Sequence, residues 1–260
     1  MADTRLRSAR GIIGLALGGA LLAVCVPSAR SSFTVHPTQI HLSRRTTTTL
    51  LMLRNEDAVP LRFQLSVFGW DQSPRGEMRL TPTDDIVFYP ALLTLGPGEE
   101  RRIRVGAAVD FGSVERTYRL FVEELPPESA AGDDGVQMLT KMGIPIFLRP
   151  ATPVAKAGLE DLRFSGGTFL FQLRNAGTVH FVPQLVRVRA FGPAREVVVD
   201  RQLDGWYVLA GGARIYDLPL ADADCGRLRT VAVEVRIGAS TLSDAVDIDP
   251  GACAPLPHAP

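Results

Sequence analysis

Short β-rich segments, separated by turn signals, run through the chain from residue 33 to residue 248. No stretch repeats its apolar residues with the helical period of about 3.6, whereas alternation of apolar and polar residues is frequent. The segments before residue 150 are 33–42, 46–55, 61–70, 101–109, 116–125 and 136–148. Many short strands at this spacing predict an all-β chain folded into antiparallel sandwiches.

A segment with two interior prolines, PATPVAKAG after Arg149, interrupts this series. Further strands are expected at 167–175, 181–191, 195–200, 206–212, 213–220, 229–238 and 240–248. Each series has the length of an ordinary domain. We therefore predict sandwich domains at 32–150 and 159–254, a linker at 151–158 and a tail at 255–260.

The first 31 residues have the pattern of a secretory signal peptide. Arg5, Arg7 and Arg10 precede an uncharged apolar run of 16 residues, and Ala29 and Ser31 fit a small-x-small cleavage site. The alternative is a membrane anchor, but a spanning helix needs about 20 apolar residues. Export without stable membrane insertion is the expectation.

Charge and catalytic motifs exclude several classes of function. Lys+Arg and Asp+Glu are both 28, whereas nucleic-acid binding favours a basic excess. The chain has no G-x-S-x-G, no H-E-x-x-H and no phosphate-binding glycine loop, and its four histidines show no metal-ligand spacing. We expect no enzyme, no cofactor and no metal.

Two cysteines remain after the signal peptide, Cys225 and Cys253. An exported chain with an even number of cysteines is expected to form disulfides. The strands 229–238 and 240–248 predict a hairpin with its turn at 238–239. Opposite residues in this hairpin would sum to about 478, as the two cysteine numbers do, so the cysteines should face each other.

The stretch VQMLTKMGIPIF (136–147) poses a separate question. Its even positions form an almost wholly apolar row, and Pro145 on the odd row predicts an edge strand because proline has no N–H. Long apolar edges promote aggregation and are usually avoided. Either the edge recognises an extended peptide by β-addition, or the even row packs inside its own sandwich. The residues alone leave both alternatives open.

The order of segments in 33–150 resembles the periplasmic chaperones of chaperone–usher pilus assembly. The matching pieces are FTVHPTQIHL, LRN, FQLSVFGWDQ, LTPTDDIVFYP, LGPGEERRIRVG, ERTYRLFVEELPP and IPIFLRP. LRNAGTVHF and DGWYVLAGGARIYDL in the second half are similar to the archaic or alternative branch of that family.

This resemblance implies two immunoglobulin-like domains in an L shape and a non-enzymatic role in the periplasm. Such chaperones bind pilus subunits by lending a strand to each incomplete subunit, and deliver the subunits to an outer-membrane usher. The donor row implied in this sequence is Val136, Met138, Thr140, Met142 and Ile144.

The sequence departs from the family at the carboxylate anchor. Family members grip the subunit's carboxyl terminus with two basic residues, and the corresponding positions carry Gln39 and Pro145. Arg104 and Lys141 are the candidate replacements. A secreted structural or adhesive protein of two immunoglobulin-like domains is the alternative function, and a secreted hydrolase is disfavoured by the missing catalytic sets.

Overall fold

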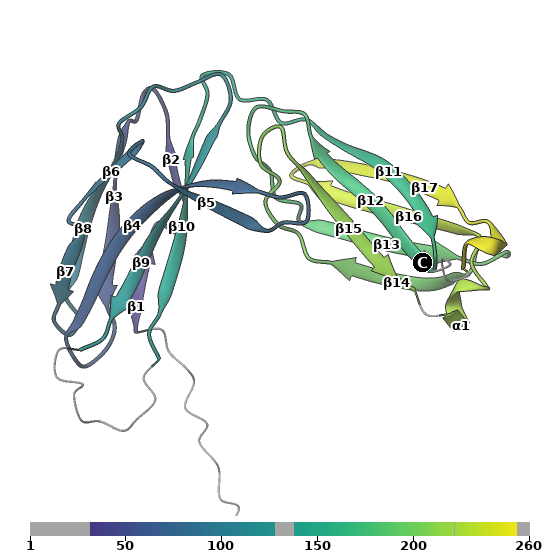
Figure 1. Ribbon diagram of the computed structural model, residues 1–260, viewed down its shortest axis with the longest axis horizontal. Helices are drawn as coiled ribbons and strands as arrows, with labels where there is room; N and C mark the ends of the chain where they lie inside the picture. Colours follow the sequence, from purple (N-terminus) through teal and green to yellow (C-terminus); the bar gives the residue numbers. More distant parts are fainter. Residues whose placement is uncertain (1–31, 128–137, 221, 254–260) are drawn as a thin grey trace, which may run out of the picture. The chain divides into compact units, whose positions relative to one another are not determined.

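The computed structural model describes residues 32–127, 138–220 and 222–253. These residues form seventeen β-strands, one short helix and one 3-10 turn (Figure 1). The strands belong to four sheets, which pack as two sandwiches with separate apolar cores.

The first sandwich pairs a four-stranded sheet with a six-stranded one. The smaller sheet has the order β1 (Phe33–His36), β3 (Thr48–Asn55), β8 (Glu100–Ala107) and β6 (Ile86–Tyr89). The larger sheet has the order β2 (Ile40–Leu42), β10 (Lys141–Leu148), β9 (Arg116–Leu125), β4 (Leu61–Gln72) and β5 (Met78–Pro82), and β7 (Leu92–Leu95) also pairs with β4.

The second sandwich has a three-stranded and a four-stranded sheet. The first contains β11 (Ala157–Ser165), β12 (Thr168–Asn175) and β15 (Ala213–Pro219). The other has the order β14 (Val197–Leu203), β13 (Leu185–Phe191), β16 (Thr230–Ile237) and β17 (Ser240–Asp247). The helix α1 (Asp222–Cys225) and the turn η1 (Pro250–Cys253) flank the last hairpin.

Alternation along the strands produces both cores, as the sequence predicts. In β12, Phe169, Phe171 and Leu173 are fully buried, and in β3 Leu51 and Leu53 are fully buried, while their neighbours are more exposed. Successive side chains of a strand point to opposite faces, so one row of each strand fills the core.

A buried asparagine performs the same task in each sandwich. The Asn55 amide donates hydrogen bonds to the carbonyls of Val59 (2.8 Å) and Leu95 (3.0 Å). The Asn175 amide donates to the carbonyls of Val179 and Val208, both at 2.9 Å. Each residue closes an LRN sequence and donates to buried backbone carbonyls, those of Leu95, Val179 and Val208.

Three expectations about the strands need correction. The predicted strand at 33–42 divides into β1 and β2, which belong to different sheets. Segment 206–212 is a loop, with an isolated bridge between Val208 and Phe181 as its only ladder contact. Strands β5, β6, β7 and β11 were not expected; β5 is exposed throughout, so it lacks the apolar row on which the sequence reasoning depended.

The predicted disulfide between Cys225 and Cys253 is present, but the register given for it is wrong. The β16–β17 ladder pairs Thr230 with Asp247, which is one residue away from the expected alignment. The turn at 238–239 is correct, since Ile237 pairs with Ser240. The cysteines lie beyond the ladder in α1 and η1, where their Cα atoms are 5.8 Å apart.

Replacing Asn55 or Asn175 by alanine should destabilise the sandwich that contains it. Each change leaves buried carbonyls without donors, which costs about 1–3 kcal/mol per group. Urea unfolding should show a loss of about 2–3 kcal/mol for either variant. Ala239→Ser, at an exposed position in the turn between β16 and β17, is the control and should leave the free energy of unfolding unchanged. A loss of less than about 0.5 kcal/mol for Asn55→Ala would contradict the role assigned to Asn55.

The disulfide should stabilise the second sandwich. The cysteines are 28 residues apart, so their bond should contribute about 3–4 kcal/mol in the chain-entropy model. Thiol titration of denatured, unreduced mature protein should find no free thiol. The double variant Cys225→Ala/Cys253→Ala should unfold at lower urea concentration, and equal midpoints would refute the contribution.

Candidate functional site

Strand β10 has a strand neighbour on both sides along only part of its length. It pairs antiparallel with β9 from Lys141 to Leu148, whereas β2 lies parallel to it only from Ile146 to Leu148. Residues Lys141–Pro145 therefore have one strand neighbour within the described chain. We call this stretch the open edge.

The backbone pattern explains how Pro145 fits at the open edge. The Glu124 N–H donates to the Thr140 carbonyl (2.9 Å), which sets the phase of the β9–β10 ladder. Hydrogen-bonded pairs alternate along an antiparallel ladder, so Met142 and Ile144 bond to β9 while Gly143 and Pro145 direct their backbone groups outward. The missing N–H of Pro145 therefore removes no bond to β9.

The predicted donor row divides between solvent and core. Met138 is 86% exposed, and Thr140 is half-buried just before β10. Met142 is partly buried against the first core. Ile144 is 1% exposed and belongs to that core. Val136 lies outside the described residues.

A buried cation lies beside the open edge. Arg119 is opposite Pro145 on β9, is 6% exposed, and has its guanidinium carbon 3.9 Å from the centre of the Trp70 ring. Its Nη1 lies 3.5 Å from the Gly143 carbonyl, while Nε and Nη2 have no hydrogen-bond partner. Burial lowers the pKa of Arg119, and the nearby Tyr207 partly offsets this.

Arg119 has no acidic partner among the described residues, which is unusual for a buried charge. Sequence reasoning missed it because a strand arginine normally reads as a surface charge. Its burial follows from the rings of Trp70 and Tyr207, which are far apart in the sequence.

The two cations proposed from the sequence have other surroundings. Arg104 lies on β8 between Leu50 and Tyr89, in the sheet that does not contain β10, so the structure does not bring it to the open edge. Lys141 lies on β10, but its Nζ forms an ion pair with Glu123 (2.7 Å). Gln39 donates a hydrogen bond from Nε2 to the Tyr207 hydroxyl (2.5 Å).

A second buried charge ties the loop before β13 to the start of β9. The Glu115 carboxylate accepts a hydrogen bond from the His180 backbone N–H (2.9 Å) and lies 2.6 Å from Nδ1 of the same residue. The His180 ring stacks on Phe147, with centroids 3.7 Å apart. Partial burial, Arg149 and His180 lower the pKa of the adjacent His41. The stacking of His180 on Phe147 helps to hold the end of β10 in place.

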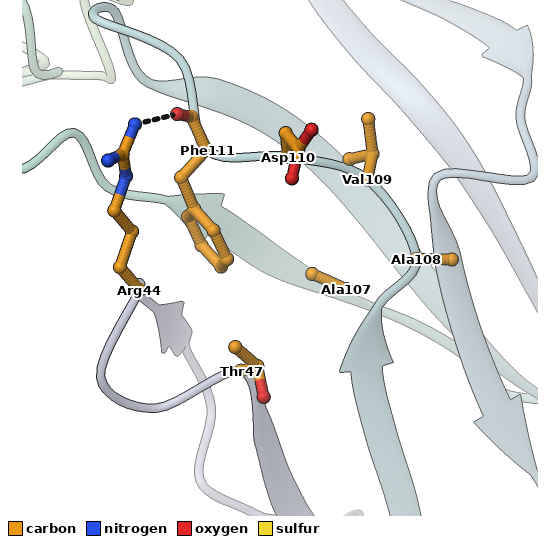
Figure 2. Close-up of a pocket in the computed structure, with 7 residues that line it drawn as sticks. All are labelled: Arg44, Thr47, Ala107, Ala108, Val109, Asp110 and Phe111. Atoms are coloured by element: carbon orange, nitrogen blue, oxygen red, sulfur yellow. Dashed lines mark hydrogen bonds between the residues drawn. The ribbon is translucent and has the colours of Figure 1, made fainter.

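One hollow of the first sandwich has no lining residue at the open edge and carries no catalytic set. It has a volume of about 980 Å³ and is lined by Arg44, Thr47 and residues 107–111. Figure 2 shows the Arg44 guanidinium donating to the Phe111 carbonyl (3.0 Å) and the Asp110 carboxylate lying apart from it. The described residues contain no group of His, Cys, Asp or Glu that could hold a metal ion. They also contain no helix of the length and apolarity that a membrane span requires.

Residues 32–153 match the family described as pili and flagellar-assembly chaperone, PapD N-terminal domain. This match covers the first sandwich. The fold of the chain is also that of solved pilus chaperones, which confirms the two immunoglobulin-like sandwiches. No curated protein sequence matches the chain.

Three solved structures illustrate the likeness. The complex of CsuC with the tip subunit CsuE, from archaic Csu pili of Acinetobacter baumannii, has a TM-score of 0.55 at 18% identity and covers 83% of this chain and 98% of that chain. The Escherichia coli chaperone DraB has a TM-score of 0.55 at 18% identity, covering 84% and 98%. SafB, in complex with the SafA pilin of Salmonella enterica, has a TM-score of 0.56 at 14% identity, covering 84% and 98%.

Proposed function

We propose that this protein is a periplasmic chaperone that binds pilus subunits at the open edge of β10 and delivers them to an outer-membrane usher. The observation that carries the proposal is a strand that is half-paired in its own sheet and preceded by the 86% exposed Met138. Such an edge offers backbone donors and acceptors to an incoming strand.

The side chains would supply the second part of the interaction. Met138 would enter an apolar groove of the subunit, Thr140 would follow at the margin, and Val136 would extend the same row. Burial of one apolar side chain contributes about 1.5–3 kcal/mol, and the unbranched methionine adapts to grooves of different shape. Met142 and Ile144 would hold the base of the strand in its own core.

Arg119 would hold the subunit's terminal carboxylate, in place of Arg104 and Lys141. A buried guanidinium without an acid is costly, because desolvation is not offset by a counter-charge. The Nε and Nη2 atoms of Arg119 have no hydrogen-bond partner, and its Nη1 lies at the outward-directed Gly143 carbonyl. Arg119 therefore lies beside the path that a subunit strand would follow along the open edge. A carboxylate arriving there would complete the ion pair after a shift of the covering Tyr207 ring.

Export would place this chemistry in the periplasm. The basic and apolar pattern of 1–31 supports secretion, and the bond between Cys225 and Cys253 suits an oxidising compartment.

Met138→Asp should abolish subunit capture without unfolding the chaperone. The carboxylate stays hydrated in the free protein, but would enter an apolar groove in the complex. Co-expression with the small β-rich product of a neighbouring gene should give normal thermal unfolding of the chaperone and little soluble complex.

Leu139→Asp is the matched control, since Leu139 is also exposed but lies on the opposite row. It should leave the complex largely intact. Equal loss of complex from both variants would show a general effect of the added charge. Unfolding of the Met138→Asp chaperone would show that the row lies in the core. Either result would refute the proposed donor row.

Arg119→Leu should separate capture from stability. Removing a buried charge that has no partner should leave the free chaperone as stable as before or more stable. Loss of charge-assisted hydrogen bonds should weaken capture by about 1.5–3 kcal/mol, or roughly 10- to 150-fold. The control Arg104→Leu changes an arginine in the other sheet and should leave subunit capture unchanged. If Arg119→Leu captures subunits as well as the wild-type protein does, Arg119 is not the carboxylate anchor.

A further inference from the structure

Sulfur in the chain after residue 31 is confined to one disulfide and four methionines. The two cysteines, Cys225 and Cys253, are bonded to each other. The methionines are Met52, Met78, Met138 and Met142. A cysteine that is already in a disulfide offers no thiolate to an oxidant. The methionine thioethers are therefore the sulfur atoms that a mild oxidant can modify in this part of the chain.

Exposure to solvent separates Met138 from the other three methionines. Met138 is 86% exposed and Met78 is 45% exposed. Met142 is partly buried against the first core, and Met52 on β3 is half-buried. An oxidant must reach the lone pairs of the sulfur atom, so the rate of oxidation follows exposure. We therefore expect Met138 to be oxidised first.

The position of Met138 gives its oxidation a consequence for the open edge. Two residues later, the Thr140 carbonyl accepts a hydrogen bond from the Glu124 N–H (2.9 Å), and the Thr140 N–H donates to the Glu124 carboxylate (3.4 Å). Residues two apart in an extended segment face the same side. A strand added along the open edge would therefore meet Met138 on the same row as Thr140. Met78, by contrast, lies on β5 at the other end of this sheet.

Oxidation changes the methionine side chain from apolar to polar. Hydrogen peroxide transfers one oxygen atom to the thioether: the O–O bond breaks, an S–O bond forms, and the sulfur is oxidised by two electrons. The second peroxide oxygen is reduced and leaves as water. A methionine sulfoxide reductase reverses the change, because two thiols are oxidised to a disulfide while the sulfoxide oxygen leaves as water.

We propose that Met138 is a reversible oxidation site at which hydrogen peroxide switches off the binding of a subunit strand at the open edge. This inference rests on the proposed function, in which Met138 enters an apolar groove of the subunit. In the free chaperone the sulfoxide stays hydrated, so the fold is unaffected. In the complex the sulfoxide would leave water for an apolar groove, which opposes binding. A bound subunit covers Met138, so the oxidant acts on the free chaperone.

Peptide mapping by mass spectrometry tests the site of oxidation. The full mature protein is treated with increasing concentrations of hydrogen peroxide, and the oxygen added at each methionine is measured. Met138 should be oxidised at the lowest concentration, Met78 next, and Met52 and Met142 last. Circular dichroism melting should be unchanged where Met138 alone is oxidised. In the preformed complex with the β-rich product of the neighbouring gene, Met138 should be protected while Met78 is oxidised as before.

Capture by peroxide-treated chaperone tests the consequence of oxidation. Each protein is mixed with the denatured product of the neighbouring gene, and its soluble complex is compared with that of its own untreated sample. Treatment should weaken capture by the wild-type protein roughly 10- to 150-fold, which is the affinity equivalent of burying one apolar side chain. Methionine sulfoxide reductases A and B should restore this capture.

Two variants assign the loss of capture to one sulfur atom. Met138→Leu has no sulfur at this position, so treated and untreated samples of this variant should capture equally. The matched control Met78→Leu removes the other well-exposed thioether. It should lose capture on treatment as the wild-type protein does.

Three outcomes would overturn the proposal and leave the proposed function standing. They are oxidation of Met52 or Met142 as early as Met138, full capture by wild-type protein oxidised at Met138, and loss of capture by treated Met138→Leu equal to that of the wild-type protein. Failure of the reductases to restore capture would refute its reversibility. A wild-type chaperone that captures nothing before treatment would refute the proposed function, and this inference with it.

Discussion

The half-paired strand β10 is the constraint around which the first sandwich is arranged. A β-strand must bond to neighbours on both sides or leave backbone groups to water. Here β2 covers only the last three residues of β10, and the core anchors the strand through Ile144 and Ile146. The remaining stretch is held straight by β9 alone, so it is ordered enough to be recognised and open enough to accept another strand.

Two charged side chains, Arg119 and Glu115, are buried near this strand together with the apolar residues. Arg119 lies under Trp70 and Tyr207 without an acid among the described residues. Glu115 accepts hydrogen bonds from His180 at Oε1, while its Oε2 has no hydrogen-bond partner. The two differ in what they imply. A buried carboxylate that accepts from a neighbouring segment stabilises that contact, whereas the unpaired Nε and Nη2 of a buried guanidinium remain available to an incoming acceptor.

The two sandwiches use the same local solution to hold their loops. Asn55 and Asn175 each end an LRN sequence and donate to carbonyls of distant loops. A short polar side chain can do this because its amide carries two donors and its carbonyl accepts a nearby N–H. Repetition of LRN was visible in the sequence, yet only the contacts reveal that these residues are buried rather than exposed at turns.

The sequence by itself determined the all-β class, the two series of strands, the cysteine pair and the unusual strand that ends at Leu148, because alternation and proline act locally along the chain. Only the tertiary structure decided which members of the even row are free: Ile144 is in the core while Met138 is exposed. It also decided the register of the last hairpin, which differs by one residue from the expected one, and the surroundings of Arg104, Arg119 and Lys141. The physical reason is that burial and pairing depend on neighbours distant in sequence, so a strand pattern predicts which rows exist but not which partners cover them.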